Sequence, residues 1–423
     1  MKRNKRHTQR VKKLIVGCGL CAVILTVSTY AWFIGMKTVN VSSFDVKIAA
    51  IDGLALSLNG STWSDTVQID KDTYSTNSYS GNTNSWGGDG LIPMSSVGQI
   101  DINSSRMILY EKGSLTTSYG GYRLMASQVT NTATGEAEEN GYVVFDLFIK
   151  NLSGSEYYQN LNKLNEEAIY LSTDSEVKVS EQGGVAGTGI ENSVRVAFAQ
   201  IGRVKATTTD VPTITGITCA TNSTVTGICH DRVAQIWEPN DTKHVQNAIN
   251  WYETSCASRT GASVTDSGAY GAFGSCGDVV DGQSYDTYAV SGVINYSDNV
   301  DVYDGDDYNG YTGTKAATAA AAGAGKLFAY DYFTDTEKNY DGTDRPTFIT
   351  LAPNSITKVR IYIYIEGQDI DNYDFASLGK KISVEFGFTK ERFFDVDVNY
   401  DGSGTTATLP DDVVKAKHPT KGE

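Results

Sequence analysis

Histidine, cysteine and proline are scarce in this sequence. It has 4 His, 6 Cys and 7 Pro among 423 residues. The zinc-protease motif H-E-x-x-H, the esterase motif G-x-S-x-G and nucleotide-binding glycine loops in a βαβ setting are absent. These absences argue against most enzyme classes, and we expect neither a catalytic residue nor a cofactor. A hydrolase that uses two carboxylates stays open, because 50 acidic residues offer many pairs.

Basic residues are scarce beyond the N-terminus. Seven of the first 13 residues are Lys or Arg, and the rest of the chain has 28 Lys and Arg against 50 Asp and Glu, a formal charge of −22. Such a surface repels nucleic acids and anionic lipids, and it favours solubility and divalent cations. We therefore expect no nucleic-acid partner.

One long apolar run stands at the start of the chain. Residues 14–36 carry no charge and follow the basic block. About 20 apolar residues suffice for a helix to span a membrane, and a basic flank stays on the cytoplasmic side. We expect residues 1–36 to form one N-terminal hydrophobic helix, with the rest of the chain secreted or at the cell surface. Small residues at Thr29 and Ala31 fit a signal-peptidase cut between Ala31 and Trp32, but the length also suits an uncleaved membrane anchor, and both readings stay open.

Most of the remaining hydrophobic periodicity has period two, as in strands with one buried face. The alternating segments are 44–48, 54–58, 143–149, 194–198, 359–365 and 382–388. Outside the N-terminal run, only residues 232–252 favour one or two helical turns. The sequence therefore predicts an all-β fold, an antiparallel jelly-roll-like β-sandwich of two packed sheets.

A segment of different composition interrupts these strands. Residues 203–329 contain four Cys, a Thr-rich run, an Asp- and Tyr-rich run and a stretch of small residues at 316–325. A long excursion between strands costs little stability. We accordingly predict the first part of the sandwich at 37–202, an inserted disulfide-containing region at 203–329, the last strands at 330–395 and a polar, disordered tail at 396–423.

The cysteines of the insertion predict disulfides. Cys219, Cys229, Cys256 and Cys276 are an even number confined to one segment of an exported chain. Among the three connectivities we prefer Cys219–Cys229 with Cys256–Cys276, because both loops are then short. A zinc site is the rival interpretation, but this segment lacks C-x-x-C pairs and regularly spaced His ligands.

The acidic turns contain one weak calcium motif. Asp397, Asn399 and Asp401 alternate before Gly402, as at the opening of a calcium loop. Thr408 occupies the position where such a loop needs Glu, so the motif is half present. Solvated acidic turns between strands are the alternative interpretation.

The N-terminal region resembles the TasA and camelysin proteins. The resemblance is carried by residues 28–33 (STYAWF), 46–48 (VKI) and 54–58 (LALSL), with an echo of the last strand of that fold at 378–388. It implies export from a Gram-positive bacterium through the signal peptidase SipW. It also implies self-assembly into fibres, in which residues 32–41 leave their own domain and complete a sheet of the next subunit. Camelysin's description as a metalloprotease is not carried over, because no zinc-protease site matches.

Three functional hypotheses follow. The first is an exported structural protein of the cell surface or biofilm matrix. The second is an adhesin or ligand-binding surface protein that the N-terminal segment anchors in the membrane. The third is the exported carboxylate-dependent hydrolase. The expected partners are a signal peptidase, the membrane and further copies of the chain; calcium is the one metal with a candidate site.

Overall fold

The computed structural model describes residues 41–50, 53–116, 122–132, 138, 140–250, 281, 327–328, 348–372 and 380–390, except 89, 97, 155, 163–164, 173, 182–186, 241 and 368. At 41–43, 111–128, 130, 181, 327–328 and 380 the description covers the backbone alone. The chain divides into the units 1–37 and 38–423, and all described residues belong to the second unit.

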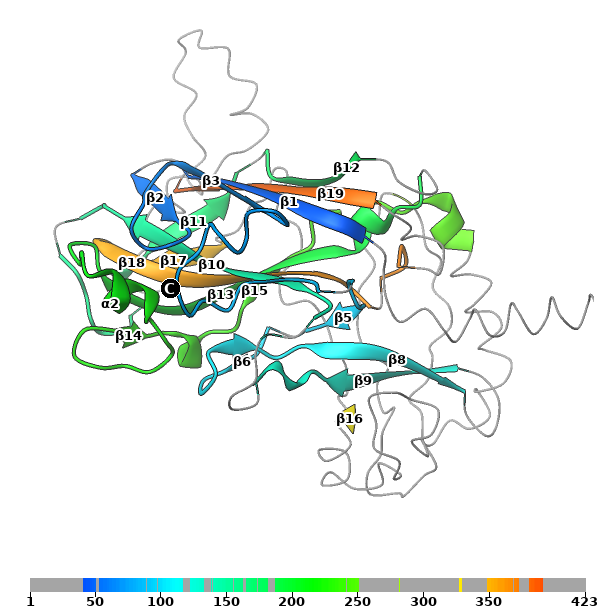
Figure 1. Cartoon of the computed structure of the whole chain (residues 1–423), viewed down its shortest axis with the longest axis horizontal. Coiled ribbons are helices and arrows are strands. Elements are labelled where there is room, and N and C mark those ends of the chain that lie inside the picture. The colour runs from blue at the N-terminus through cyan, green and yellow to red at the C-terminus, as the bar shows by residue number, and fades with distance from the viewer. Residues whose placement is uncertain are drawn as a thin grey trace, which may run out of the picture. The chain divides into compact units, whose positions relative to one another are not determined.

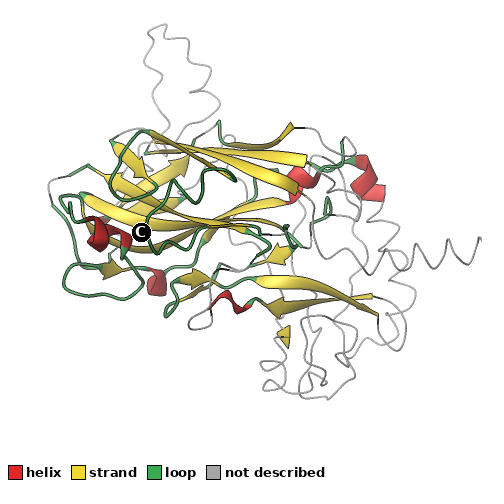
Figure 2. Cartoon of the chain, viewed as in Figure 1, coloured by secondary structure: helices red, strands yellow, loops and turns green. Residues whose placement is uncertain are grey.

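Strands dominate the described residues, and helices are few and short (Figure 2). The all-β class predicted from the sequence is therefore confirmed. The strands are β1 (Val41–Ala50), β2 (Leu54–Ser57), β3 (Thr66–Asp70), β4 (Ser85–Trp86), β5 (Met94–Ser95), β6 (Ile100–Asp101), β7 (Arg106–Met107), β8 (Tyr110–Thr116), β9 (Tyr122–Gln128), β10 (Val143–Asn151), β11 (Glu167–Leu171), β12 (Glu176–Glu181), β13 (Val194–Lys205), β14 (Thr226–Gly227), β15 (Gln235–Trp237), β16 (Leu327–Phe328), β17 (Ile349–Leu351), β18 (Ser355–Ile365) and β19 (Lys380–Thr389). The helical elements are η1 (Thr130–Thr132), η3 (Ile190–Ser193), α2 (Val211–Thr215), η4 (Cys229–Asp231) and a turn at 246–250.

One sheet has six strands in the order β17-β11-β19-β1-β3, with β12 also paired to β19. β1 runs antiparallel to β3 but parallel to β19, where Val46 lies opposite Val384. This parallel pair departs from the purely antiparallel sandwich that we expected. Its two strands come from opposite ends of the chain, so no hairpin forces them to run antiparallel.

A second sheet has seven strands in the order β14-β13-β18-β10-β2, with β15 added to β13 and β4 to β10. Its centre is antiparallel: β18 pairs with β13 through Ile363 and Val196, and with β10 through Ile361 and Phe145. The short strands β14 and β15 come from residues that the sequence analysis placed in the insertion. Up to residue 250, the described part of that segment therefore packs as part of the sandwich.

The strands β1 and β19 of one sheet lie above β10, β13 and β18 of the other in Figure 1. A continuous apolar core contains side chains of both sheets. Alternate residues of β1, β10, β13, β18 and β19 enter it, as the period-two pattern predicted. Phe198 lies at its centre, with its ring centroid 4.8 Å from that of Phe348 and 5.1 Å from that of Phe386. Each such side chain contributes about 1.5–3 kcal/mol by leaving water.

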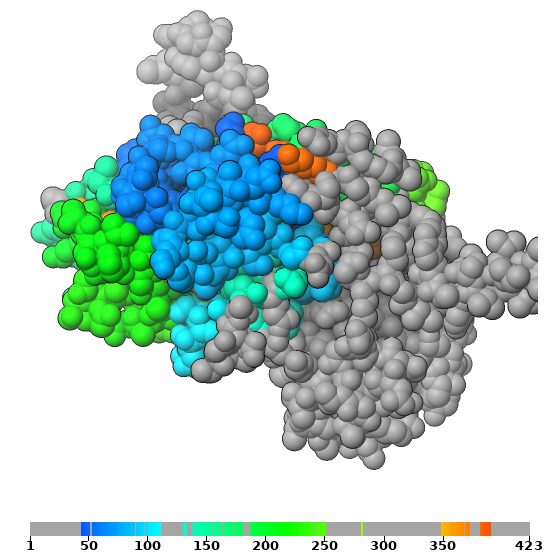
Figure 3. All heavy atoms as spheres, viewed as in Figure 1, coloured from blue at the N-terminus to red at the C-terminus, as the bar shows by residue number. Residues whose placement is uncertain are grey.

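The outer face of the seven-stranded sheet is buried as well. Every residue of β18 is buried, including the ones that alternate with the core positions. A second apolar cluster covers this face and includes Met94, Met107, Ile214, Tyr362 and Tyr364. Figure 3 shows the segment after β3 in blue and the segment after β13 in green as neighbouring parts of one face of the molecule. The expectation of strands with one buried face is therefore wrong for this sheet, because the loops form a third layer over it.

Candidate functional site

The disulfide between Cys219 and Cys229 joins two ends of the loop that follows α2. Their Cα atoms are 5.5 Å apart, and both residues are buried in the second apolar cluster. The sequence predicted this pairing, and the structure contains it. Gly227 is required beside it, because a Cβ at this position would overlap the carbonyl oxygen of Cys219.

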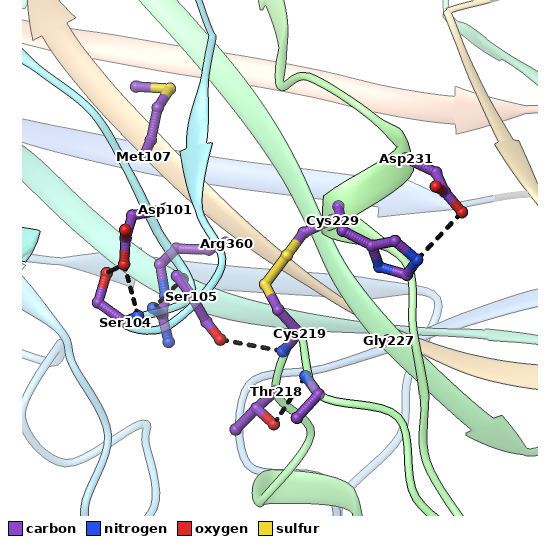
Figure 4. The surroundings of a disulfide bond; sticks show 12 residues. Asp101, Ser104, Ser105, Met107, Thr218, Cys219, Gly227, Cys229, Asp231 and Arg360 are labelled. Atoms are coloured by element: carbon purple, nitrogen blue, oxygen red, sulfur yellow. Dashed lines mark hydrogen bonds and ion pairs between the residues drawn. A yellow bond between two sulfur atoms is a disulfide. The ribbon is translucent and has the colours of Figure 1, made fainter.

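Ser105 connects the disulfide loop to the sheet. The backbone N–H of Cys219 donates to Ser105 Oγ at 3.0 Å, while Arg360 Nη1 donates to the carbonyl oxygen of Ser105 at 2.7 Å (Figure 4). Ser105 has a φ of 57°, a left-handed conformation that costs a non-glycine residue of order 1 kcal/mol or more. These two hydrogen bonds hold the residue in that conformation.

Arg360 also belongs to a buried ionic cluster on the outer face. Its Nε lies 2.8 Å from Asp146 Oδ1, and Lys358 Nζ lies 3.4 Å from Asp146 Oδ2. Tyr79 donates its hydroxyl to the same carboxylate. Burial alone would raise the pKa of Asp146, but the positive charges of Arg360 and Lys358 outweigh it and hold the pKa far below its usual value.

A second buried cluster surrounds Glu166. Its carboxylate accepts hydrogen bonds from Arg232 Nη2 at 2.7 Å, from Thr350 Oγ1 at 2.6 Å and from Arg203 Nη1. Burial would raise the pKa of Glu166, yet the arginines and the hydrogen bonds lower it. The cluster connects β13 to the segment that carries Arg232 and to β17.

Further buried pairs connect residues 238–245 to β13 and to residues 369–371. Arg195 bridges Glu238 at 2.9 Å and Asp369 at 2.7 Å. His244 Nδ1 lies 2.9 Å from Asp371 Oδ2, and the N–H of Val245 donates to the same carboxyl group at 3.0 Å. Burial raises the pKa of Asp371 despite these partners. Each charge here contacts an opposite charge or a donor, so these clusters tie loops to the sheet.

β3 presents one free edge of the six-stranded sheet. One side of β3 pairs with β1, and no other strand within the described ranges pairs with its second side. Thr66 and Gln68 are exposed, whereas Ile69 faces the core. On this side the main-chain groups of Thr66 bond to Ser64 Oγ and those of Asp70 bond to Thr73. A further strand that pairs with β3 through main-chain hydrogen bonds would therefore displace these local bonds.

β1 extends further towards the N-terminus than its partner β3. The ladder with β19 begins at Val41 opposite Lys380, whereas the ladder with β3 covers only Asp45 to Ala49. The strand therefore continues towards its N-terminus past the end of β3. Of residues 32–41, which we expect to exchange, Val41 alone lies within the described residues.

Several predicted site residues lie outside the described residues: Ala31, Trp32, Cys256, Cys276, Asp397, Asn399 and Asp401. In the part of the chain that is described, no three Cys, His, Asp or Glu side chains are grouped to hold a metal ion. Nor does any helix of that part have the length and hydropathy to cross a membrane. The calcium motif, the cleavage site, the N-terminal helix and the second disulfide stay predictions.

The sequence pattern did not predict the buried ionic clusters. Arg360 was visible in the alternation of residues 359–365, but a charged residue at such a position usually faces water. An excess of charged residues on two neighbouring strands, Asp146 on one and Lys358 with Arg360 on the other, is the signal that could have revealed them.

Comparison of the chain with protein-family models, curated proteins and solved structures gives no match.

Proposed function

We propose that this protein is an exported structural protein of the cell surface or biofilm matrix that polymerises by donating its N-terminal strand. The proposal includes the finer assignments: a jelly-roll-like sandwich with a disulfide-bearing insertion, preceded by one hydrophobic helix, of the TasA and camelysin type. The observation that carries it is a disulfide in an all-β body that follows a basic and then apolar N-terminus. Disulfides persist in oxidising compartments, which supports export.

The strand edges support the assembly step. A signal-peptidase cut after Ala31 would release a chain that begins with the apolar residues 32–36 and continues into β1. Such a segment is unfavourable as a free tail in water. Pairing with the free edge of β3 on another copy would bury it, with main-chain hydrogen bonds for affinity and alternate side chains for register.

The test compares two soluble forms of the protein, one that starts at Trp32 and one that starts at Ser42, without residues 32–41. We expect ordered polymer, visible by electron microscopy and sedimentation, from the longer form alone, while both forms give the same β-type circular dichroism spectrum. A matched variant that keeps the length but replaces residues 32–36 by Gly and Ser should remain monomeric.

N-terminal sequencing of the protein from its native source completes the test. A mature chain that begins at Trp32 supports the proposal. A chain that retains residues 1–31, together with monomers from both soluble forms, contradicts it and favours the membrane-anchored adhesin.

A further inference from the structure

A lysine, an asparagine and a glutamate from three separate strands meet at one end of the sandwich. Asn151 is the last residue of β10, Glu167 is the first of β11, and Lys390 directly follows β19. Lys390 Nζ lies 3.0 Å from Asn151 Oδ1 and 3.1 Å from Glu167 Oε2. Asn151 Nδ2 donates to Glu167 Oε2 at 2.8 Å, which closes the triangle.

The amide of Asn151 is placed for attack by the amine. Because a C=O bond is about 1.23 Å long, Lys390 Nζ lies within about 4.2 Å of the amide carbon. The Asn151 side chain is fully buried, so water competes poorly with the amine. Amine and amide held together in this way react as an intramolecular pair, with an effective concentration far above that of free reactants.

Donors already surround the oxygen on which negative charge would develop. The backbone N–H of Ser153 donates to Asn151 Oδ1 at 3.1 Å, and the Ser153 hydroxyl lies 2.7 Å from the same oxygen. The Ser153 hydroxyl is also within hydrogen-bond distance of Glu167 Oε2, so its single proton turns to Asn151 Oδ1 once Glu167 is protonated. Together with the Ser153 N–H it then gives the two donors that stabilise a tetrahedral intermediate in acyl transfer. Asn151 Nδ2 also donates to the carbonyl oxygen of Ala352 at 3.1 Å, which fixes the plane of the amide.

Glu167 contacts both groups whose protons must move. Burial would raise the pKa of its carboxyl group, but hydrogen bonds from Ser153, Asn151 and Lys390 lower it, so the carboxylate is ionised near neutral pH. An ionised carboxylate can take a proton from the lysine ammonium and then deliver it to the leaving nitrogen.

We propose that Lys390 and Asn151 form an intramolecular isopeptide bond, with Glu167 as the proton carrier. Glu167 removes a proton from the Lys390 ammonium, and the Nζ lone pair attacks Cγ of Asn151. The tetrahedral oxyanion on Oδ1 is held by Ser153. It collapses with cleavage of the Cγ–Nδ2 bond while Glu167 protonates Nδ2. Glu167 then takes the second proton from Nζ, which leaves a neutral amide, and passes it to the departing ammonia, which leaves as ammonium. One amide replaces another, so no oxidant, reductant or further reactant is needed.

The bond would join the two sheets covalently. β10 lies in the seven-stranded sheet and β19 in the six-stranded sheet, where β19 is also the partner of β1. A link at this end would prevent β19 from separating from β10, which suits a protein that bears tension.

Mass spectrometry of the purified full chain tests the proposal, after reduction and alkylation of the cysteines. We expect a mass lower than the sequence mass by one ammonia, and a branched tryptic peptide that joins the segment of Asn151 to that of Lys390. A chain of full mass without such a peptide overturns the proposal and leaves a hydrogen-bonded ion pair.

Three variants test which residues take part in the reaction. Lys390→Arg keeps the positive charge but cannot form the bond, so its mass should equal the sequence mass. Lys381→Arg is the matched control, because Lys381 pairs with Asp45 at 2.8 Å instead, and this variant should still have lost one ammonia. Glu167→Gln should leave Asn151 and Lys390 unlinked. Loss of ammonia in Lys390→Arg overturns the bond assignment, and complete linkage in Glu167→Gln overturns the role of Glu167. Circular dichroism shows whether each variant retains the fold.

Discussion

Both faces of the seven-stranded sheet are buried, but the outer face carries a cluster of charged side chains among its apolar ones. On the inner face, Leu147 and Ile361 enter an apolar core, whereas on the outer face their neighbours Asp146 and Arg360 form an ion pair. Burial on the inner face is favourable in itself. On the outer face it is costly, and the cost is offset only because each charge meets an opposite charge and hydrogen-bond donors. The inner face thus depends on close packing, while the ionic cluster on the outer face depends on complete pairing.

Removing one member of the ionic cluster on the outer face should lower the stability of the protein strongly. Asp146→Ala leaves Arg360 and Lys358 buried without their counter-charge, and we expect a loss of about 3–5 kcal/mol in the free energy of unfolding. Urea unfolding at pH 7 measures it. A loss below about 1 kcal/mol would mean that water or another acid replaces the carboxylate.

The pH dependence of that loss identifies its electrostatic origin. The pKa of Asp146 is lower in the folded state than in the unfolded state, where it is about 3.9. The carboxylate therefore stabilises the fold above this pH, and the contribution is lost as pH falls through the lower folded value. The difference between the natural chain and Asp146→Ala should stay constant above about pH 5 and shrink below about pH 4.

Leu147→Ala is the matched change on the inner face, one residue along the same strand. Lost apolar burial and the remaining cavity should cost about 2–5 kcal/mol. Unlike the loss in Asp146→Ala, this loss should not change between pH 3 and pH 7, as parallel urea titrations would show. A loss of stability in Leu147→Ala that depends on pH would contradict the assignment of the pH dependence to the Asp146 carboxylate.

Removing the disulfide tests how firmly the covering loops are attached. The double variant Cys219→Ala/Cys229→Ala frees a loop of ten residues, which should cost about 2–3 kcal/mol. Thermal unfolding with and without a reducing agent measures it. The natural chain under reduction should match the variant; a larger effect of reduction would point to a further disulfide at Cys256 and Cys276.

The smallest effect belongs to an exposed pair. Lys47 Nζ lies 3.5 Å from Glu385 Oε2, and the lysine side chain is 54% exposed. Lys47→Ala should change the free energy of unfolding by less than about 1 kcal/mol, and salt should reduce the change further. An effect as large as that of Asp146→Ala would contradict the view that burial gives the outer-face pairs their strength.

Local pattern predicted much of the fold. The alternation at 143–149, 194–198, 359–365 and 382–388 predicted β10, β13, β18 and β19, because strands with one apolar face need that alternation whatever covers the other face. For the same reason, the pattern could not reveal the layer of loops over the seven-stranded sheet. The parallel pairing of β1 with β19 was equally hidden, since alternation carries no information on strand partners.

The candidate sites differ in the same way, because only the site whose residues are close in sequence could be predicted. Cys219 and Cys229 are close in sequence and of a rare type, so their pairing could be predicted. Asn151, Glu167 and Lys390 are common residues, and 239 positions separate the asparagine from the lysine. The order of the strands alone brings them together, and single-sequence patterns do not encode it.

The parallel pairing of β1 with β19 sets the order of events during synthesis. β1 leaves the ribosome early, but its partner emerges only when nearly the whole chain has been made. At a synthesis rate of about 5–20 residues per second, β1 waits on the order of tens of seconds without β19. The six-stranded sheet thus closes last, and the high contact order of this pair predicts slow folding. If the chain is exported as proposed, the six-stranded sheet stays incomplete until the segment that forms β19 has also crossed the membrane.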